Sequence, residues 1–194
     1  FFLMEYFTQS ENWVIHSGSP HVYNGGNIGC GVIVDRDNTL LLDLLEGRSY
    51  SNSVPLRQAT VHWVGDRYGS ISAPAISHYA SELAGFDRVN GVYNYGQSGG
   101  IAELTLSAAM QTAALEAMGA NKGTVAVYNY KTGQILCAVT TPTYDPDNVP
   151  DIAGDTTGTF EGIYLNRFVQ SSYTPGSIFK VVTTGEDDNF PKRI

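Results

Sequence analysis

The sequence has few basic residues, and those it has do not cluster. Of the 194 residues, 11 are Lys or Arg and 19 are Asp or Glu, so the formal net charge is -8 at pH 7. A surface that follows nucleic-acid phosphates needs gathered Lys and Arg side chains. The acidic balance therefore argues against a nucleic-acid partner.

Long apolar runs are also absent. No stretch approaches the roughly 18 to 20 apolar residues that a membrane-spanning helix needs. Residues 1–7 are apolar but much shorter than this. They fit either the last turns of a membrane anchor that begins before this sequence or the start of an amphipathic helix, and the sequence leaves both interpretations open.

Metal-ligand spacings are missing as well. The two cysteines, Cys30 and Cys137, follow no Cys-x-x-Cys pattern, so we expect free, mostly buried thiols, with a disulfide as the alternative. The four histidines show no His-x-x-x-His spacing; they are His16, His21, His62 and His78. The acidic series in the loop lacks the central glycine and final glutamate of a calcium loop, and we expect solvated carboxylates at Asp145, Asp147, Asp151 and Asp155. We expect no metal and no cofactor.

The residues that are present predict a globular protein of mixed α+β class. Hydrophobic residues make up 42% of the chain, and 21 glycines and 12 tyrosines suit strands and turns. The segment 95–100, Tyr-Gly-Gln-Ser-Gly-Gly, is the most linker-like point. We therefore expect a β-rich region over residues 1–100 and a second domain over residues 101–194.

In the first region the patterns predict a short helix at the N-terminus, followed by a loop. Two strands over residues 31–34 and 39–42 flank a charged turn at 35–38, interpreted as solvated. Residues 59–64 have a strand-like composition. A helix over 77–84 would bury one face; the apolar residues on it are Ile76, Tyr79, Ala80 and Leu83.

The second region begins with an amphipathic helix over 107–118, with Ser107 as N-cap and Gly119 as stop. Its expected core stripe consists of Met110, Ala113, Ala114, Ala117 and Met118. Residues 123–129 and 134–140 predict a hairpin whose turn, 130–133, ends in glycine. A long loop over 141–165 leads to a helix that begins near Ser177.

The candidate catalytic residues are Ser177 and Lys180. Residues three apart on a helix share a face, so the Lys180 amine can lie beside the Ser177 hydroxyl. A lysine of lowered pKa is one known activator of a nucleophilic serine. The start of a helix also stabilises developing negative charge.

An ordered series of segments accompanies this pair; they are residues 104–106, 110–111, 123–127, 131–139, 142–146, 166–167, 170 and 173–180. This series resembles the class B penicillin-binding proteins, the transpeptidases that crosslink peptidoglycan. Residues 31–42 also resemble the segment that opens the family's membrane-proximal region, with Asn38 where glycine is usual.

The resemblance implies the opening part of a penicillin-binding transpeptidase and β-lactamase-like domain, which comprises a helix, a hairpin and a nucleophile helix. It implies that Ser177 forms an acyl-enzyme with D-alanyl-D-alanine stem peptides and with β-lactams. It also implies an anchor N-terminal to this chain, a place on the extracytoplasmic face of a bacterial membrane, other cell-wall synthesis proteins as partners, and a role in cell shape.

The family uses two further motifs, a Ser-x-Asn type and a Lys-Thr-Gly, after the serine. Only 14 residues follow Lys180 and they contain neither, so we expect a chain truncated after the first motif. Residues 131–133 spell Lys-Thr-Gly and residues 10–12 spell Ser-x-Asn, but both precede Ser177, and we interpret them as a turn and as chance. A non-catalytic scaffold module and a β-lactamase or β-lactam sensor are the alternatives.

Overall fold

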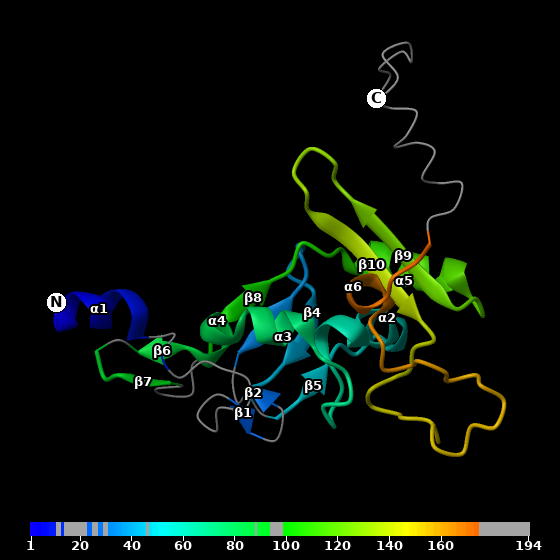
Figure 1. Cartoon of the computed structure of the whole chain (residues 1–194), viewed down its shortest axis with the longest axis horizontal. Helices are drawn as coiled ribbons and strands as arrows, with labels where there is room; N and C mark the ends of the chain where they lie inside the picture. Colours follow the sequence, from blue (N-terminus) through cyan, green and yellow to red (C-terminus); the bar gives the residue numbers. More distant parts are fainter. Residues whose placement is uncertain are drawn as a thin grey trace, which may run out of the picture.

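The computed structural model describes residues 1–10, 13, 23–24, 27–28, 31–45, 47–87, 89–93 and 99–174. Helices and small sheets alternate along these residues, which confirms the mixed α+β class. Figure 1 shows α1 (Phe2–Gln9) at one end of the molecule and the hairpin of β9 and β10 toward the other. The predicted helix at Ser177 lies outside the described residues.

The first sheet has four strands in the order β5-β4-β3-β8. Its strands are β3 (Val32–Val34), β4 (Leu40–Asp43), β5 (Ser49–Tyr50) and β8 (Ile101–Glu103). β3 pairs antiparallel with β4 and parallel with β8. The predicted pair of strands is confirmed, and Asn38 in their turn has a φ of 60°, a left-handed conformation that asparagine tolerates better than most residues.

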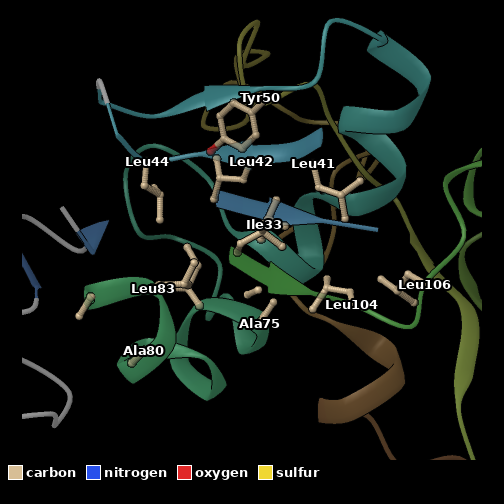
Figure 2. Packing of buried hydrophobic residues seen from close by; sticks show 14 of the residues in the cluster. Ile33, Leu41, Leu42, Leu44, Tyr50, Ala75, Ala80, Leu83, Leu104 and Leu106 are labelled. Carbon is tan, nitrogen blue, oxygen red and sulfur yellow. The ribbon is translucent and has the colours of Figure 1, made fainter. Parts of the chain in front are cut away.

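The main apolar core lies between this sheet and the short helices that cover it (Figure 2). Ile33 and Leu42 are fully buried on the sheet, and Leu83 is fully buried on the helical side. Burial of such side chains contributes roughly 1.5–3 kcal/mol each. The helices are α3 (Pro74–His78) and α4 (Ala80–Ala84), so the single predicted helix is two, which meet at Tyr79.

The predicted strand at 59–64 is wrong, because these residues form the second half of helix α2 (Val54–Val64). The Ser53 side chain accepts a hydrogen bond from the Leu56 N–H, and proline lies in the first turn, where its missing N–H costs nothing. Gly65, with a φ of 78°, ends the helix. The β-branched residues that suggested a strand are instead buried on one helix face.

Helix α5 (Ala108–Met118) has the predicted boundaries, with Ser107 and Gly119 as its flanking residues. Part of its predicted buried face is confirmed, since Met118 is buried and Met110 and Ala114 pack against the core. The rest is wrong, because Ala113 and Ala117 are exposed and Gln111 is buried in their place. Alanine methyl groups gain little from burial, whereas the Gln111 amide finds two partners inside the molecule. The helix is therefore rotated toward Gln111.

The predicted hairpin is confirmed as β9 (Gly123–Tyr128) and β10 (Ile135–Thr141), which pair antiparallel. Gly133 has a φ of 76° in the turn, a conformation that favours glycine. β10 is buried from Cys137 onward, whereas Val125 and Val127 on β9 are about 40% exposed. One long face and one edge of this hairpin therefore meet solvent.

The remaining described elements are small. β1 (Tyr23–Asn24) pairs with β2 (Asn27–Ile28), β6 (Phe86–Asp87) pairs with β7 (Val92–Tyr93), and α6 (Arg167–Gln170) follows the long loop. As predicted, a short helix opens the chain; α1 buries none of its side chains. None of the helices within the described ranges is long and apolar enough to cross a membrane.

Candidate functional site

Ser177 and Lys180 both lie outside the described residues, which end three positions earlier at Thr174. The described part of the site is therefore the path that leads the chain to Ser177. That path consists of the loop after β10, helix α6 and the extended residues 171–174. Its position depends on contacts of α6 with α2, β9 and β10, which lie near α6 in Figure 1.

The C-terminal end of α2 is satisfied by side chains that come from other elements. The last carbonyl groups of a helix lack partners within the helix. Here the Val64 carbonyl accepts from Arg48 Nη2 at 3.1 Å, and the Gly65 carbonyl just beyond accepts from the Tyr50 hydroxyl at 2.9 Å. The third partner comes from the nucleophile path and is Asn166.

Asn166 joins the end of α2 to the start of α6. Its Nδ2 donates to the His62 carbonyl at 3.0 Å, and its Oδ1 accepts from the Phe168 N–H at 3.1 Å as the N-cap of α6. The residue is only 1% exposed. The side-chain amide of Asn166 therefore forms hydrogen bonds at the C-terminal end of α2 and at the N-terminal end of α6.

Two neighbours fix α6 further. Arg167 Nε donates to the Thr141 carbonyl at 3.0 Å, and its Nη2 donates to the Glu161 carbonyl at 2.9 Å. The Phe168 ring lies 6.1 Å from the Trp63 ring, centroid to centroid. The start of the path is thus attached to the end of β10, to the preceding loop and to α2.

His62 is a buried core histidine. It is 2% exposed, and its Nε2 lies 2.8 Å from the Ile163 carbonyl, to which it donates. Burial lowers the pKa of the imidazole, so the neutral ring is favoured. His78 is exposed, and His16 and His21 fall outside the described residues.

Gln111 connects three elements beneath the path. Its Nε2 donates to the Ala59 carbonyl of α2 at 3.2 Å, and its Oε1 accepts from the Ala138 N–H of β10 at 2.8 Å. Trp63 Nε1 donates to the Ala138 carbonyl at 2.7 Å. These bonds hold α2, α5 and β10 in one arrangement.

The loop carboxylates are structural, and the expectation that all are solvated is wrong for Asp145. Asp145 is 8% exposed and accepts two hydrogen bonds from Arg57, at 2.8 and 2.6 Å. These bonds hold the pKa of the Asp145 carboxyl below its ordinary value. Asp147 pairs with Arg67 at 2.5 Å, and Asp151 and Asp155 accept backbone N–H bonds within the loop.

The charged turn at 35–38 also differs from its solvated interpretation. Asp35 is 1% exposed, and its Oδ2 accepts from the Ala108 N–H at the start of α5, at 2.8 Å. Burial opposes ionisation of this carboxyl, but the backbone N–H bonds that it accepts outweigh burial and lower its pKa. Asp35 therefore caps α5, since the Ser107 side chain makes no cap bond.

The two motif look-alikes have the expected explanations where they are described. Lys131, Thr132 and Gly133 form the exposed hairpin turn, closed by a bond from the Gly133 N–H to the Asn129 carbonyl at 2.7 Å. Ser10 ends α1, and residues 11–12 lie outside the described residues. Cys137 is a free buried thiol whose pKa burial raises, and Cys30 is not among the described residues.

Within the ranges that the structure describes, no cluster of three or more His, Cys, Asp or Glu side chains could hold a metal ion. An open groove of about 540 Å³ lies between α3, β8 and β10, lined largely by apolar residues such as Tyr79, Leu104 and Ile135. Trp63 also lines this groove and links it to α6 through Phe168.

Sequence reasoning missed the structural roles of Asn166, Gln111 and Arg57. One local signal was available, since asparagine is a preferred N-cap and Asn166 precedes a short helix. The partners of Gln111 and Arg57 lie 27 to 88 residues away, and no local pattern identifies them.

Residues 123–185, which include Ser177 and Lys180, match the family described as the penicillin binding protein transpeptidase domain. A curated protein of Mycolicibacterium smegmatis, "Peptidoglycan D,D-transpeptidase PbpA", is 35% identical over 100 residues, which cover 44% of this chain and 20% of that protein. The protein of the same name from Mycobacterium tuberculosis (strain H37Rv) is 35% identical over 99 residues, with the same shares. The matched part thus spans about a fifth of the length of these relatives.

Proposed function

We propose that this chain carries the nucleophile-bearing segment of a peptidoglycan D,D-transpeptidase, because residues 123–185 match the penicillin binding protein transpeptidase domain. The observation that carries the proposal is that the match extends through Ser177 and Lys180, the pair selected on chemical grounds.

In the proposed reaction the Ser177 oxygen bonds to the carbonyl carbon of the penultimate D-alanine. The peptide bond to the terminal D-alanine breaks, and the Ser177 proton passes through Lys180 to the departing amine. An amine of a neighbouring stem then displaces Ser177 and completes the crosslink. A β-lactam would acylate the same oxygen as its ring opens.

The proposal includes the setting of the reaction. The substrates would be peptidoglycan stem peptides, on the extracytoplasmic face of a bacterial membrane, with an anchor N-terminal to these residues and with other cell-wall synthesis proteins as partners. Cell shape would depend on the activity. Residues 1–100 would form the non-catalytic, membrane-proximal region, and residues 101–194 would belong to the transpeptidase domain.

Labelling with a fluorescent penicillin, followed by denaturing electrophoresis, tests the nucleophile. Carboxylate binding and the oxyanion site require motifs that this sequence does not contain after Lys180, so residues 1–185 are joined to the region that follows the matched segment in the M. smegmatis relative. We expect a labelled band from this fusion and none from the 194-residue chain alone.

Two variants of the fusion serve as test and control. Ser177→Ala removes the attacking oxygen and should abolish the label. Ser172→Ala makes the same chemical change at an exposed serine five residues earlier and should leave it intact. A label that survives Ser177→Ala, or a folded fusion that never labels, refutes the assignment.

A further inference from the structure

We propose that Asn166 is a positioning residue of the segment that leads to Ser177, because its side chain holds the start of α6 against the last turn of α2. This inference rests on the proposed function for its consequence in catalysis. The contacts that carry it are independent of that function, since they involve only residues that the structure describes.

The chemistry of the junction requires an amide. The His62 carbonyl needs a donor and the Phe168 N–H needs an acceptor, and the two lie at 3.0 and 3.1 Å from the two ends of the Asn166 amide. Aspartate supplies only acceptors when ionised, and the serine hydroxyl is too short to span both helices. The backbone N–H of Asn166 also donates to Gln170 Oε1 at 2.8 Å, so the last residue of α6 is bonded to its N-cap residue.

The remaining attachments fix the orientation of α6 around this point. Arg167 holds the backbone at Thr141 and Glu161, and Phe168 packs on Trp63. None of these contacts replaces the bond to His62, which among the described residues is the only polar contact between Asn166 or α6 and the last turn of α2. Loss of the Asn166 donor would leave the N-cap of α6 intact, but α6 could then change its orientation relative to α2.

The distance along the chain links this junction to the reaction. Ser177 lies three positions after Thr174, and an extended chain spans at most about 3.6 Å per residue, so the two Cα atoms lie within roughly 11 Å of each other. Because this connection is short, a shift of α6 would change the range of positions open to the Ser177 hydroxyl. A misplacement of about 1 Å can reduce a catalytic rate on the order of a hundredfold.

Distances between spin labels on the 194-residue chain, measured by electron spin resonance, test whether Asn166 positions α6 and residues 171–174. Spin labels are attached through Thr174→Cys and Ala113→Cys, both exposed sites, in a Cys30→Ser background, while Cys137 is buried and protected. We expect a narrow distance distribution that broadens at least about twofold in Asn166→Ser, which retains a capping oxygen. A control pair at Ala113 and Thr132, in the hairpin turn, should not change.

Asn121→Ser is the matched control, because the Asn121 Nδ2 also donates to a helix-end carbonyl, that of Met118 at 2.9 Å, but lies off the path. It should leave both distributions unchanged. An unchanged Thr174 distribution in Asn166→Ser overturns the proposal. If the distance distribution of the control pair also broadens, Asn166→Ser has lost the fold, and the Thr174 distance is measured in Asn166→Gln instead. The amide of Asn166→Gln should restore a narrow distribution, and a broad one overturns the proposal.

In the labelling fusion described above, Asn166→Ser should lower the second-order rate of penicillin labelling roughly tenfold or more, and Asn121→Ser should not. An unchanged rate in Asn166→Ser overturns the catalytic consequence. Absence of label from the unmodified fusion refutes the proposed function instead. The spin-label distances then test only whether Asn166 positions α6 and the residues that follow it.

Discussion

Replacing Gln111 by glutamate should make the stability of this protein strongly dependent on pH. Gln111 is fully buried, with its Nε2 donating to the Ala59 carbonyl and its Oε1 accepting from the Ala138 N–H. Gln111→Glu preserves the shape of the side chain. The glutamate retains an oxygen that accepts from the Ala138 N–H. Its second oxygen replaces the Nε2 donor and faces the Ala59 carbonyl, which is also an acceptor.

The neutral carboxyl can repair this junction, because its O–H donates to the Ala59 carbonyl as the amide did. The carboxylate cannot, and a fully buried glutamate can have a pKa of about 8–9, compared with about 4.3 in an unfolded chain. The folded variant then binds more protons than the unfolded chain between these values. Its stability is retained at low pH and falls by about 1.4 kcal/mol per pH unit as the pH rises.

The size of the effect follows from these values. Keeping the carboxyl protonated should cost about 1.6 kcal/mol at pH 5.5 and about 4 kcal/mol at pH 7.5. Urea unfolding followed by circular dichroism at the two pH values measures the difference. Gln134→Glu, at an exposed position in the hairpin turn, is the control and should change stability by less than about 0.5 kcal/mol. A penalty that is equal at both pH values would refute the assigned donor and acceptor roles.

Four further outcomes are expected. Arg57→Lys loses the bidentate contact with Asp145 and should cost about 1–3 kcal/mol at pH 7. Because this contact lowers the pKa of Asp145, the loss should shrink as the pH falls through the folded pKa, and a urea-measured penalty that does not shrink between pH 7 and the lowest pH at which the protein stays folded would contradict it. Gly133→Ala should lower the stability by about 1 kcal/mol in thermal unfolding, since the φ of Gly133 is 76° and an added Cβ meets nothing within 4 Å. Lys131→Ala should leave penicillin labelling of the fusion unchanged, and loss of labelling would mean that residues 131–133 contribute to the reaction. Exposed strands such as β9 favour pairing between chains, so we expect the 194-residue chain to self-associate. Val127→Lys charges this strand and should shift the chain toward monomer in size-exclusion chromatography, and an unchanged elution profile would argue against association through β9.

The elements that the sequence predicted correctly are those with local causes. The β9 and β10 hairpin depends on a turn that ends in Gly133, and the β3 and β4 pair depends on a turn of polar residues between two apolar runs. Helix α5 has its stop at Gly119, next to its last residue. In each case the deciding residues lie within a few positions of the element.

The failures have distant causes. Residues 59–64 look like a strand, and they are helical because Ser53 caps the segment and because their buried face packs against α5 and β10. Asp35 appears to be a solvated turn residue, yet its partner Ala108 lies 73 residues later. Asn166 reaches His62 across 104 residues. Buried polar contacts of this kind follow from the tertiary structure and leave little local signal in the sequence.

The position of α2 in the chain has a consequence for how the protein is made. Its later polar partners come 52 to 104 residues further along the chain, at Gln111, Ala138, Thr143, Asp145, Ile163 and Asn166. At synthesis rates of about 5–20 residues per second, these partners are made on the order of 3–20 s after α2. During that interval the face of α2 that packs on α5 and β10 is uncovered, and chaperones or aggregation can compete for it. A native structure that depends on such remote pairings should also form slowly, because loop closure precedes the contacts that stabilise it.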